Sequence, residues 1–415
     1  MRRVPIIGLS LSLICSIANA APDEAELGRA RNYPIGTAGT WEFDQSVRVG
    51  SFTHQAEIPG IFRGGVNVLQ PSKNPMPLRV AQPEPPFRWN VGELRSLTVD
   101  DYLSRQRITG LLIVKDATIQ VERYQYGRTP SDRFTSESIA KSITALAVGI
   151  ALGEGKIRRI DDRAEDYLPS LRGTLYGGTM LRNLLRMASG ARYEQTNDFT
   201  GDTRRFSNAI SRAGVESAAR IVVNRAAAEG ELFHYASSEA AVLGAVLRGA
   251  TGESLSAYLT PRLWQAMGAE SSALWRTDRT GLEITLANFN ATLRDYGRLG
   301  TVLAYDGTRP DDRTVQVIPR DFLRDATDWQ RVPEHFRPGK ADAYWGYGYL
   351  FWLFPGPERR FAMLGSFGQS IFVDPSLKLV MVEMGVNKTR EAGDSSLARE
   401  RDAFWRGVVS LYGKW

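Results

Sequence analysis

The sequence has few of the residues and motifs that several common enzyme classes require. It contains one cysteine and three histidines in 415 residues. Cys15 lies in the N-terminal hydrophobic segment, so the rest of the chain forms no disulfide and has no thiol nucleophile. His54, His234 and His335 stand far apart and lack the spacing of zinc ligands. Neither a Gly-x-Ser-x-Gly elbow nor a Gly-x-x-x-x-Gly-Lys phosphate loop occurs, and we predict no metal and no cofactor.

Positive charge is present but is not concentrated in any one region. The formal net charge is +6 and the sequence pI is about 9.4. Lys and Arg are dispersed along the chain, without the long basic runs that are typical of nucleic-acid-binding proteins. We therefore expect no nucleic-acid partner, and the sequence leaves the oligomeric state open.

The first twenty residues have the pattern of a targeting segment. Arg2 and Arg3 form a basic start, residues 4–17 are mostly apolar, and Ala18-Asn-Ala20 is a small-residue cleavage site. A hydrophobic run of about fourteen residues is too short to span a bilayer as a helix. The pattern predicts cleavage after Ala20 and a periplasmic or secreted protein without a stable membrane anchor.

Ser138 and Lys141 form a Ser-x-x-Lys motif ahead of an apolar run, residues 143–152. Thr135 and Ser136 are natural N-caps, which predicts a helix beginning just before Ser138. Side chains three residues apart share one helix face. A helix that is apolar on nearly every side is usually buried, and a lysine at its mouth loses solvation, which favours the neutral amine. Such an amine can activate serine as a nucleophile; the alternative is an exposed serine and a solvated lysine.

Tyr235 is the candidate proton shuttle about a hundred residues further on, within His234-Tyr-Ala-Ser237. A phenol against the ammonium of Lys141 would have a lowered pKa and could pass a proton to the leaving group. Two alternatives remain open at this point. Tyr235 can be a core tyrosine bonded to backbone, and His234 can be the base instead.

Gly365-Ser366-Phe-Gly-Gln369 is the third candidate element, placed just before a predicted strand. Glycines at the start of a strand allow a substrate to approach the backbone closely. An N–H from this strand edge and the N–H of Ser138 at a helix start could together bind an oxyanion. The alternative is a glycine-rich connection without a function.

The distribution of patterns predicts an α+β fold. Residues 21–94 are rich in Pro and Gly and are expected to form an extended arm. Residues 160–288 are expected to be a helical domain, whereas 95–159 and 289–415 are expected to form one α/β domain. Its antiparallel sheet would take strands from both chain ends, with helices on both faces. The expected strands are 110–114, 118–124, 347–354, 360–364, 370–374 and 377–384, and the expected helices are 100–106, 182–187, 216–228, 240–247, 255–267, 290–303 and 395–411.

The order of the motifs resembles the serine β-lactamase and penicillin-binding-protein superfamily. The resemblance runs from about residue 95 to the C-terminus and is greatest to the 6-aminohexanoate-dimer hydrolases and to β-lactamase-like (family VIII type) esterases. It implies a three-layer α/β/α, transpeptidase-like fold with an all-α insert. The motifs are Phe134-x-x-x-Ser138-x-x-Lys141-Ser142, Leu185-x-Met187-x-Ser189-Gly190, Phe233-x-Tyr235-x-Ser237, Asn290 to Gly300, Gly346 to Trp352, and Gly365-x-Phe-Gly368-Gln369 with Val373-Asp-Pro375.

The resemblance also implies roles for single residues. Ser138 would be the acylated nucleophile, Lys141 its general base and Tyr235 the proton shuttle. Ser366 lies where the family supplies a strand-edge oxyanion N–H, beside Gly365 and Gln369, and Ser237 would contact the substrate.

The departures from the superfamily pattern bear on the substrate. Ser237 stands where many members carry Asn, and no Lys or His lies near Gly365. The cation that usually holds a β-lactam or peptide carboxylate is therefore missing from its usual place. We expect an exported serine hydrolase acting on a small-molecule ester or linear amide. The alternatives are a penicillin-binding or β-lactamase/D-peptidase-type protein with little ester turnover, and an interaction protein that kept only the fold.

Overall fold

The computed structural model describes residues 21–196, 200–390 and 396–415, so the predicted targeting segment lies outside the described residues. Among the described helices, none is both long and apolar enough to cross a membrane. The strands are β1 (Arg63–Leu69), β2 (Arg79–Val80), β3 (Trp89–Val91), β4 (Leu94–Leu97), β5 (Ile108–Lys115), β6 (Thr118–Tyr124), β7 (Arg133–Thr135), β8 (Ala273–Asp278), β9 (Phe289–Thr292), β10 (Gly346–Tyr347), β11 (Trp352–Leu353), β12 (Phe361–Gly365), β13 (Gln369–Asp374) and β14 (Leu379–Gly385). The α-helices are α1 (Gln45–Thr53), α2 (Val99–Arg105), α3 (Ile139–Gly153), α4 (Leu181–Leu185), α5 (Gly201–Ala213), α6 (Val215–Ala219), α7 (Ser237–Thr251), α8 (Leu255–Leu259), α9 (Leu293–Ala304), α10 (Arg320–Thr327) and α11 (Ser396–Tyr412).

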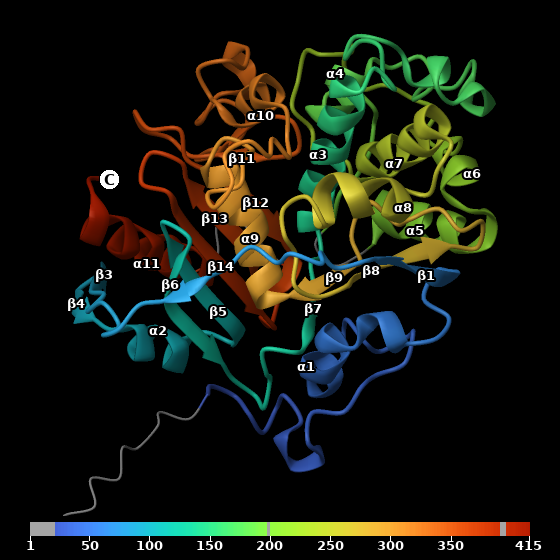
Figure 1. The fold of residues 1–415 in the computed structure, drawn as a ribbon. Helices are drawn as coiled ribbons and strands as arrows, with labels where there is room; N and C mark the ends of the chain where they lie inside the picture. Colours follow the sequence, from blue (N-terminus) through green and yellow to red (C-terminus); the bar gives the residue numbers. More distant parts are fainter. Residues whose placement is uncertain (1–20, 197–199, 391–395) are drawn as a thin grey trace, which may run out of the picture.

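The larger sheet joins the two ends of the chain (Figure 1). Its strand order is β10-β11-β12-β13-β14-β5-β6-β2, and only the short β2 runs parallel to its neighbour. The β5–β6 hairpin comes from before the Ser-x-x-Lys motif, and β14 from the C-terminal part pairs with β5, placing Val382 opposite Leu112. The predicted mixed-origin antiparallel sheet is therefore confirmed. The strand expected over 347–354 is instead a tight hairpin of β10 and β11.

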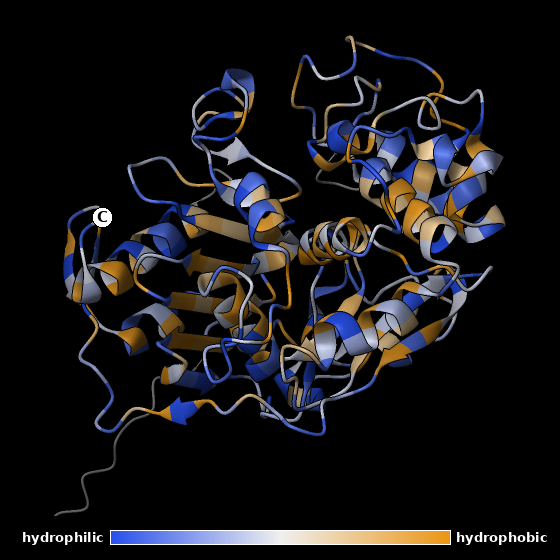
Figure 2. Ribbon diagram, turned by 45° about the horizontal axis from the view of Figure 1, so that its top comes forward, coloured by the Kyte–Doolittle hydropathy of each residue, from blue (hydrophilic) through white to orange (hydrophobic). Residues whose placement is uncertain are grey.

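Alternate residues of these strands enter two separate cores, which gives three layers. Leu112 of β5 and Val382 of β14 pack in the core shared with α3 and α9. Ile113 and Met381 face the other way, into a core that α2 and α11 cover with residues such as Trp405. Period-two alternation in a strand buried on both faces produces this arrangement. Figure 2 shows the large sheet as predominantly hydrophobic, with helices on both sides.

A second sheet, of order β1-β8-β9-β7, was not predicted. Strand β8 lies in the region expected to be helical, and β9 occupies the start of the helix expected over 290–303. That helix begins later, as α9, because the Thr292 side chain accepts the Asp295 N–H and caps it there. The sheet matters for the site because β7 leads directly into the turn that carries Ser138.

The helical part departs from the predicted boundaries in two places. The helix expected over 216–228 ends at Ala219 in α6, and the following chain runs extended, with Arg225 bridging to Ala191. Helix α5, which was not predicted, buries Phe206 and Ile210 on one face. Both differences arise because tertiary pairing and burial override local propensity.

The arm before residue 95 is more structured than an extended segment. Asp44 caps α1 by accepting the Ser46 N–H, and β1 pairs with β8. Phe52 of α1 packs edge-on against Phe367, in the turn between β12 and β13. The arm therefore reaches the C-terminal part of the chain close to the motif Gly365 to Gln369.

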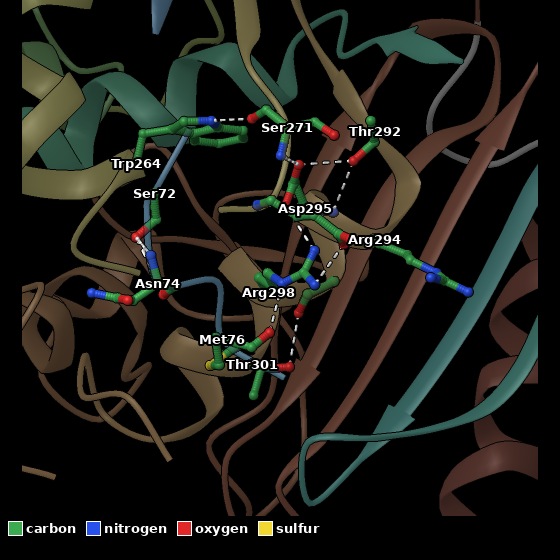
Figure 3. A network of polar contacts seen from close by, with 12 residues as sticks. Ser72, Asn74, Met76, Trp264, Ser271, Thr292, Arg294, Asp295, Arg298 and Thr301 are labelled. Atoms are coloured by element: carbon green, nitrogen blue, oxygen red, sulfur yellow. Dashed lines mark hydrogen bonds and ion pairs between the residues drawn. The ribbon is translucent and has the colours of Figure 1, made fainter. Parts of the chain in front are cut away.

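A buried ion pair holds the N-terminus of α9 (Figure 3). Asp295 accepts the Ser271 N–H at 2.9 Å and the Thr292 hydroxyl at 2.9 Å. Arg298 donates to Asp295 at 2.9 Å and to the Met76 carbonyl at 2.9 Å. The motif over 290–300 therefore ties the arm and the segment before β8 to α9, and its role is structural.

Candidate active site

The turn between β7 and α3 presents Ser138. The Ser136 N–H donates to the Phe289 carbonyl at 2.7 Å, which fastens the turn to β9. Helix α3 begins at Ile139 with Ser138 as its N-cap residue, slightly later than the sequence predicts. The residue before it, Glu137, has φ of 45°, a left-handed conformation that is uncommon for a residue with a side chain. The turn thus leaves the Ser138 N–H at a helix start, where N–H groups point outward.

Lys141 lies against Ser138, as the spacing predicts. Its Nζ is 2.8 Å from Ser138 Oγ and 2.6 Å from the carbonyl oxygen of Leu286. The lysine is only 2% exposed. Burial lowers the pKa of Lys141 to about 7, with the carboxylate of Glu137 opposing this shift and Arg390 adding to it. At neutral pH a large fraction of the amine is therefore uncharged and able to accept the hydroxyl proton.

Tyr235 also lies at this site, within an aromatic enclosure. Nζ of Lys141 is 5.4 Å from the centre of the tyrosine ring. The ring stacks on Trp352 at 5.7 Å, with Tyr347 edge-on at 6.1 Å. Burial raises the pKa of Tyr235 to about 12, and a hydrogen bond with the Ser138 hydroxyl partly opposes this. The prediction that the pKa of the Tyr235 phenol is lowered is wrong. The aromatic rings exclude water, and the neighbouring amine of Lys141 favours its own neutral form, so it does not stabilise a phenolate.

Gly365 ends β12 in direct contact with the turn before Ser138. A Cβ at this position would lie 2.6 Å from the Ser136 carbonyl oxygen and 3.0 Å from Cβ of Glu137. Only glycine permits this approach. The next residue, Ser366, opens a short 3-10 turn and is half-buried. Ser366 therefore directly follows the residue that contacts the turn before Ser138.

The remaining predicted residues differ in how they are used. Gln369 is buried, and its Nε2 donates to the Gly385 carbonyl at 2.8 Å and to the Ser366 carbonyl at 3.2 Å. These two bonds hold the turn against the end of β14, so the side-chain amide of Gln369 has a structural role. Ser237 is the first residue of α7, and its N–H donates to Gln195 Oε1 at 3.0 Å.

The side chain of His234 bonds to a loop carbonyl and not to the Lys141–Ser138 pair, although the sequence predicts it as an alternative base. Its side chain is exposed, and Nε2 bonds the Tyr193 carbonyl oxygen at 2.5 Å. The backbone N–H of His234 donates to the Met187 carbonyl at 2.8 Å. The histidine fastens the loop before Tyr235. Within the described residues, no group of three or more His, Cys, Asp or Glu side chains could hold a metal ion.

Three contributors to the site were missed in the sequence. Trp352 stood in a predicted strand and at the end of the motif Gly346 to Trp352 without a role, yet it supports the ring of Tyr235. The Leu286 carbonyl, which holds the lysine amine, comes from a segment without any motif. Glu137 stood inside the quoted motif without a role; a carboxyl directly before a buried helix is the signal that could have singled it out.

Comparisons with known proteins show the family and the fold of the chain. The profile of the Beta-lactamase family matches residues 97–403, so the chain belongs to that family. A beta-lactamase from Pseudomonas fluorescens is 29% identical over 116 residues, a match that spans 25% of this chain and only 32% of that relative.

Solved structures share the fold over most of the chain. A Bacillus anthracis protein named as a 6-aminohexanoate-dimer hydrolase superposes with a TM-score of 0.76 at 22% identity, covering 91% of this chain and 96% of that one. A family VIII carboxylesterase superposes with a TM-score of 0.55 at 17% identity, covering 73% and 93%. At these identities the likeness shows the fold. The protein has a serine-hydrolase-type beta-lactamase fold, whose structural neighbours include esterases and amide hydrolases.

Proposed function

We propose that the protein hydrolyses a carboxylic ester or a linear amide through an acyl-enzyme on Ser138. The contact between Lys141 and Ser138 carries this proposal: Nζ lies 2.8 Å from Oγ, and burial favours the neutral amine. A hydroxyl in contact with such a base is an activated nucleophile. The site is built from β7, α3 and the segment before α7, so it does not depend on one flexible loop.

The reaction follows from the positions of the polar groups. Lys141 takes the hydroxyl proton as Ser138 Oγ attacks the carbonyl carbon. The N–H groups of Ser138 and Ser366 stabilise the oxyanion. Tyr235, whose pKa is raised to about 12, stays protonated at neutral pH. It donates its proton to the leaving alcohol or amine and takes one from the Lys141 ammonium, and water then releases the acid and regenerates Ser138.

The surroundings of Tyr235 favour a linear substrate with an apolar part. The tyrosine ring stacks on Trp352 at 5.7 Å, and the rings of Phe233 and Tyr347 lie edge-on to it. Aromatic walls suit an alkyl or aryl leaving group. The stretch Gly365 to Gln369 carries no Lys or His to hold a substrate carboxylate, so we rank β-lactam turnover below ester and 6-aminohexanoate-type amide hydrolysis.

Labelling of the nucleophile tests the proposal. A fluorophosphonate probe should modify Ser138, and Ser138→Ala should abolish both labelling and the hydrolysis of p-nitrophenyl butyrate. The matched control is Ser142→Ala, because Ser142 also lies on α3 but its hydroxyl donates to the carbonyl of Leu350, in the turn between β10 and β11. Hydrolysis retained in Ser138→Ala would rule the mechanism out.

A second candidate function, β-lactam binding or cleavage, is favoured by the family match. A substrate panel separates the two: p-nitrophenyl butyrate, the linear dimer of 6-aminohexanoate and a chromogenic cephalosporin. We expect turnover of the ester or the dimer and little of the cephalosporin. Efficient cephalosporin turnover would reverse the ranking.

A further inference from the structure

The short turn between β12 and β13, Ser366–Gly368, contains a residue in an unfavourable backbone conformation. Phe367, at its centre, is 2% exposed and has φ of 62°. A residue with a side chain keeps this left-handed conformation only where its surroundings over-determine it, because the conformation costs free energy. The contacts that hold Phe367 therefore also bear on the position of Ser366, which is joined to it by one peptide bond.

Arg48 of α1, in the arm, contacts Phe367 directly. Its guanidinium carbon lies 4.3 Å from the centre of the Phe367 ring, and the arginine is 2% exposed. Burial lowers the pKa of Arg48 to about 10, with the carboxylate of Glu42 opposing the shift. The group is therefore still charged at neutral pH, and a desolvated cation over an aromatic face is attracted to the ring.

The same guanidinium joins the arm to the segment after β14. Its Nε donates to the Glu42 carbonyl at 2.8 Å, and its Nη1 donates to the Asn387 carbonyl at 2.5 Å. The Asn387 N–H in turn donates to the Phe367 carbonyl at 2.9 Å. Arg48 therefore holds Phe367 in two ways, directly over the ring and indirectly through Asn387.

Two further contacts enclose the turn. Phe52, also on α1, packs edge-on against the Phe367 ring at 5.5 Å. On the other side, a Cβ at Gly368 would lie 2.8 Å from Nδ2 of Asn387. The turn is thus enclosed between the arm and the segment after β14, so a change in the Arg48 contact is transmitted to it.

Stability alone does not account for a buried arginine at this position. The arm already shares an apolar core with Phe367, in which Leu27, Val49 and Ile58 are buried. A buried guanidinium costs desolvation free energy, and an apolar residue of similar size often stabilises a fold equally well. What arginine adds is a planar group whose donors fix the geometry of the acceptors around it.

We propose that Arg48 is a positioning residue that fixes the backbone at Ser366 through its contact with Phe367. The inference rests on the proposed function, because it assigns a support to one of the two proposed oxyanion donors. Donors that are held in place before the reaction stabilise the oxyanion without reorganising when its charge develops. The arm is then part of the support of the active site.

Replacement of Arg48 tests the inference. Arg48→Met keeps most of the side-chain length and removes the planar donors. It should lower kcat for p-nitrophenyl butyrate by about 10- to 100-fold, because a small displacement of an oxyanion donor has an effect of this size. KM should change by less than about twofold, because the contact acts in the transition state. Arg48→Lys keeps a charge that can bond one carbonyl and should recover part of the loss.

Each rate is divided by the concentration of active sites, titrated with a fluorophosphonate. Molecules that have unfolded are then not counted, so a residue that only supports the fold would leave the rate per titrated site unchanged.

A boronic acid measures the oxyanion site separately from turnover. When butylboronic acid binds, Ser138 Oγ adds to boron and its proton passes to Lys141, so the adduct is tetrahedral and anionic like the transition state. Transition-state analogues bind through the interactions that accelerate the reaction. The dissociation constant of butylboronic acid should therefore rise in Arg48→Met by about the factor by which kcat/KM falls.

Arg107→Met is the matched control. Arg107 is also a buried arginine at the arm, 7% exposed, but it pairs with Asp23 and Glu26 at the start of the described chain. Its replacement should lower the urea midpoint of unfolding. The rate per titrated site and the affinity for butylboronic acid should stay unchanged.

Three results would overturn the inference. The first is an unchanged rate per titrated site with unchanged boronate affinity in Arg48→Met. The second is an equal loss of rate in Arg107→Met, which would show a general effect of loosening the arm. The third is failure of both Arg48 variants to fold, which would make the residue structural. Normal labelling of Ser138 alongside the first result would disprove only the role of Arg48, whereas hydrolysis that survives Ser138→Ala would disprove the proposed function itself.

Discussion

A glutamate is buried on each face of the large sheet, and the two glutamates differ in their hydrogen bonding. On the face covered by α2 and α11, Glu383 of β14 accepts a hydrogen bond from the Tyr102 hydroxyl at 2.5 Å. On the face covered by α3 and α9, Oε1 of Glu137 has no such partner among the described residues. Burial raises the pKa of both carboxyls, to about 7 for Glu383 and about 8 for Glu137.

The difference indicates that Glu383 contributes to stability, whereas Glu137 lies among the groups that we propose for catalysis. Around Glu383 the hydrogen-bonding Tyr102 is itself held by packing, with its ring stacked on Phe404 at 4.1 Å. A buried polar group with its partner present fixes the structure. Near Glu137, an amine with a lowered pKa, a phenol with a raised pKa and a serine hydroxyl lie together. Perturbed groups that contact one another are the arrangement that acid–base catalysis requires.

The largest effects should come from the two groups on the α3 face that we propose move protons. Lys141→Met and Tyr235→Phe should each lower kcat for p-nitrophenyl butyrate by at least ~100-fold, since each removes a general acid–base contribution. Both should fold, as judged by circular dichroism. Tyr102→Phe, which removes a phenol from the opposite face, is the control and should keep a near-normal rate. Rates close to normal in the first two variants would show that these roles are misassigned.

Gly365→Ala should have the next largest effect. The added Cβ would lie 2.6 Å from the Ser136 carbonyl oxygen. The end of β12 must then move away from the turn before Ser138, and the two proposed oxyanion donors separate. We expect kcat/KM to fall by about 10- to 100-fold. Gly65→Ala is the control, because its Cβ would meet only Thr277 Oγ1, at 3.9 Å. Equal rates for the two variants would contradict this placement of Gly365.

Tyr102→Phe should have the smallest effect on the rate and a measurable effect on stability. It leaves the Glu383 carboxyl buried without its donor, which costs about 1–3 kcal/mol of unfolding free energy. Urea denaturation followed by tryptophan fluorescence measures this loss. If stability is unchanged while the rate falls, it is wrong to assign stability to the face covered by α2 and α11 and catalysis to the face covered by α3 and α9.

The elements that the sequence predicted well are those with a strong local signal. Residues three apart at a helix start must share a face, so the Ser138–Lys141 contact was predictable. The hydrophobic strands at the two chain ends were predictable as β5, β6, β12, β13 and β14, because alternation and buried apolar runs mark them. The strand β8 and the helix α1 carry weaker signals, and they form because the body of the protein supplies their partners.

The sequence alone determined which chemistry is possible here. It supplies the hydroxyl of Ser138, the amine of Lys141 and the phenol of Tyr235, and it offers neither a thiol nucleophile after the N-terminal segment nor a spacing of metal ligands. Only the tertiary structure decided their ionisation. Whether Lys141 loses its charge, and whether Tyr235 keeps its proton, depends on how much water the packed chain excludes and which charges it brings near. The arm, the segment after β14 and the aromatic rings around Tyr235 come from distant parts of the sequence, so no local pattern specifies their joint effect.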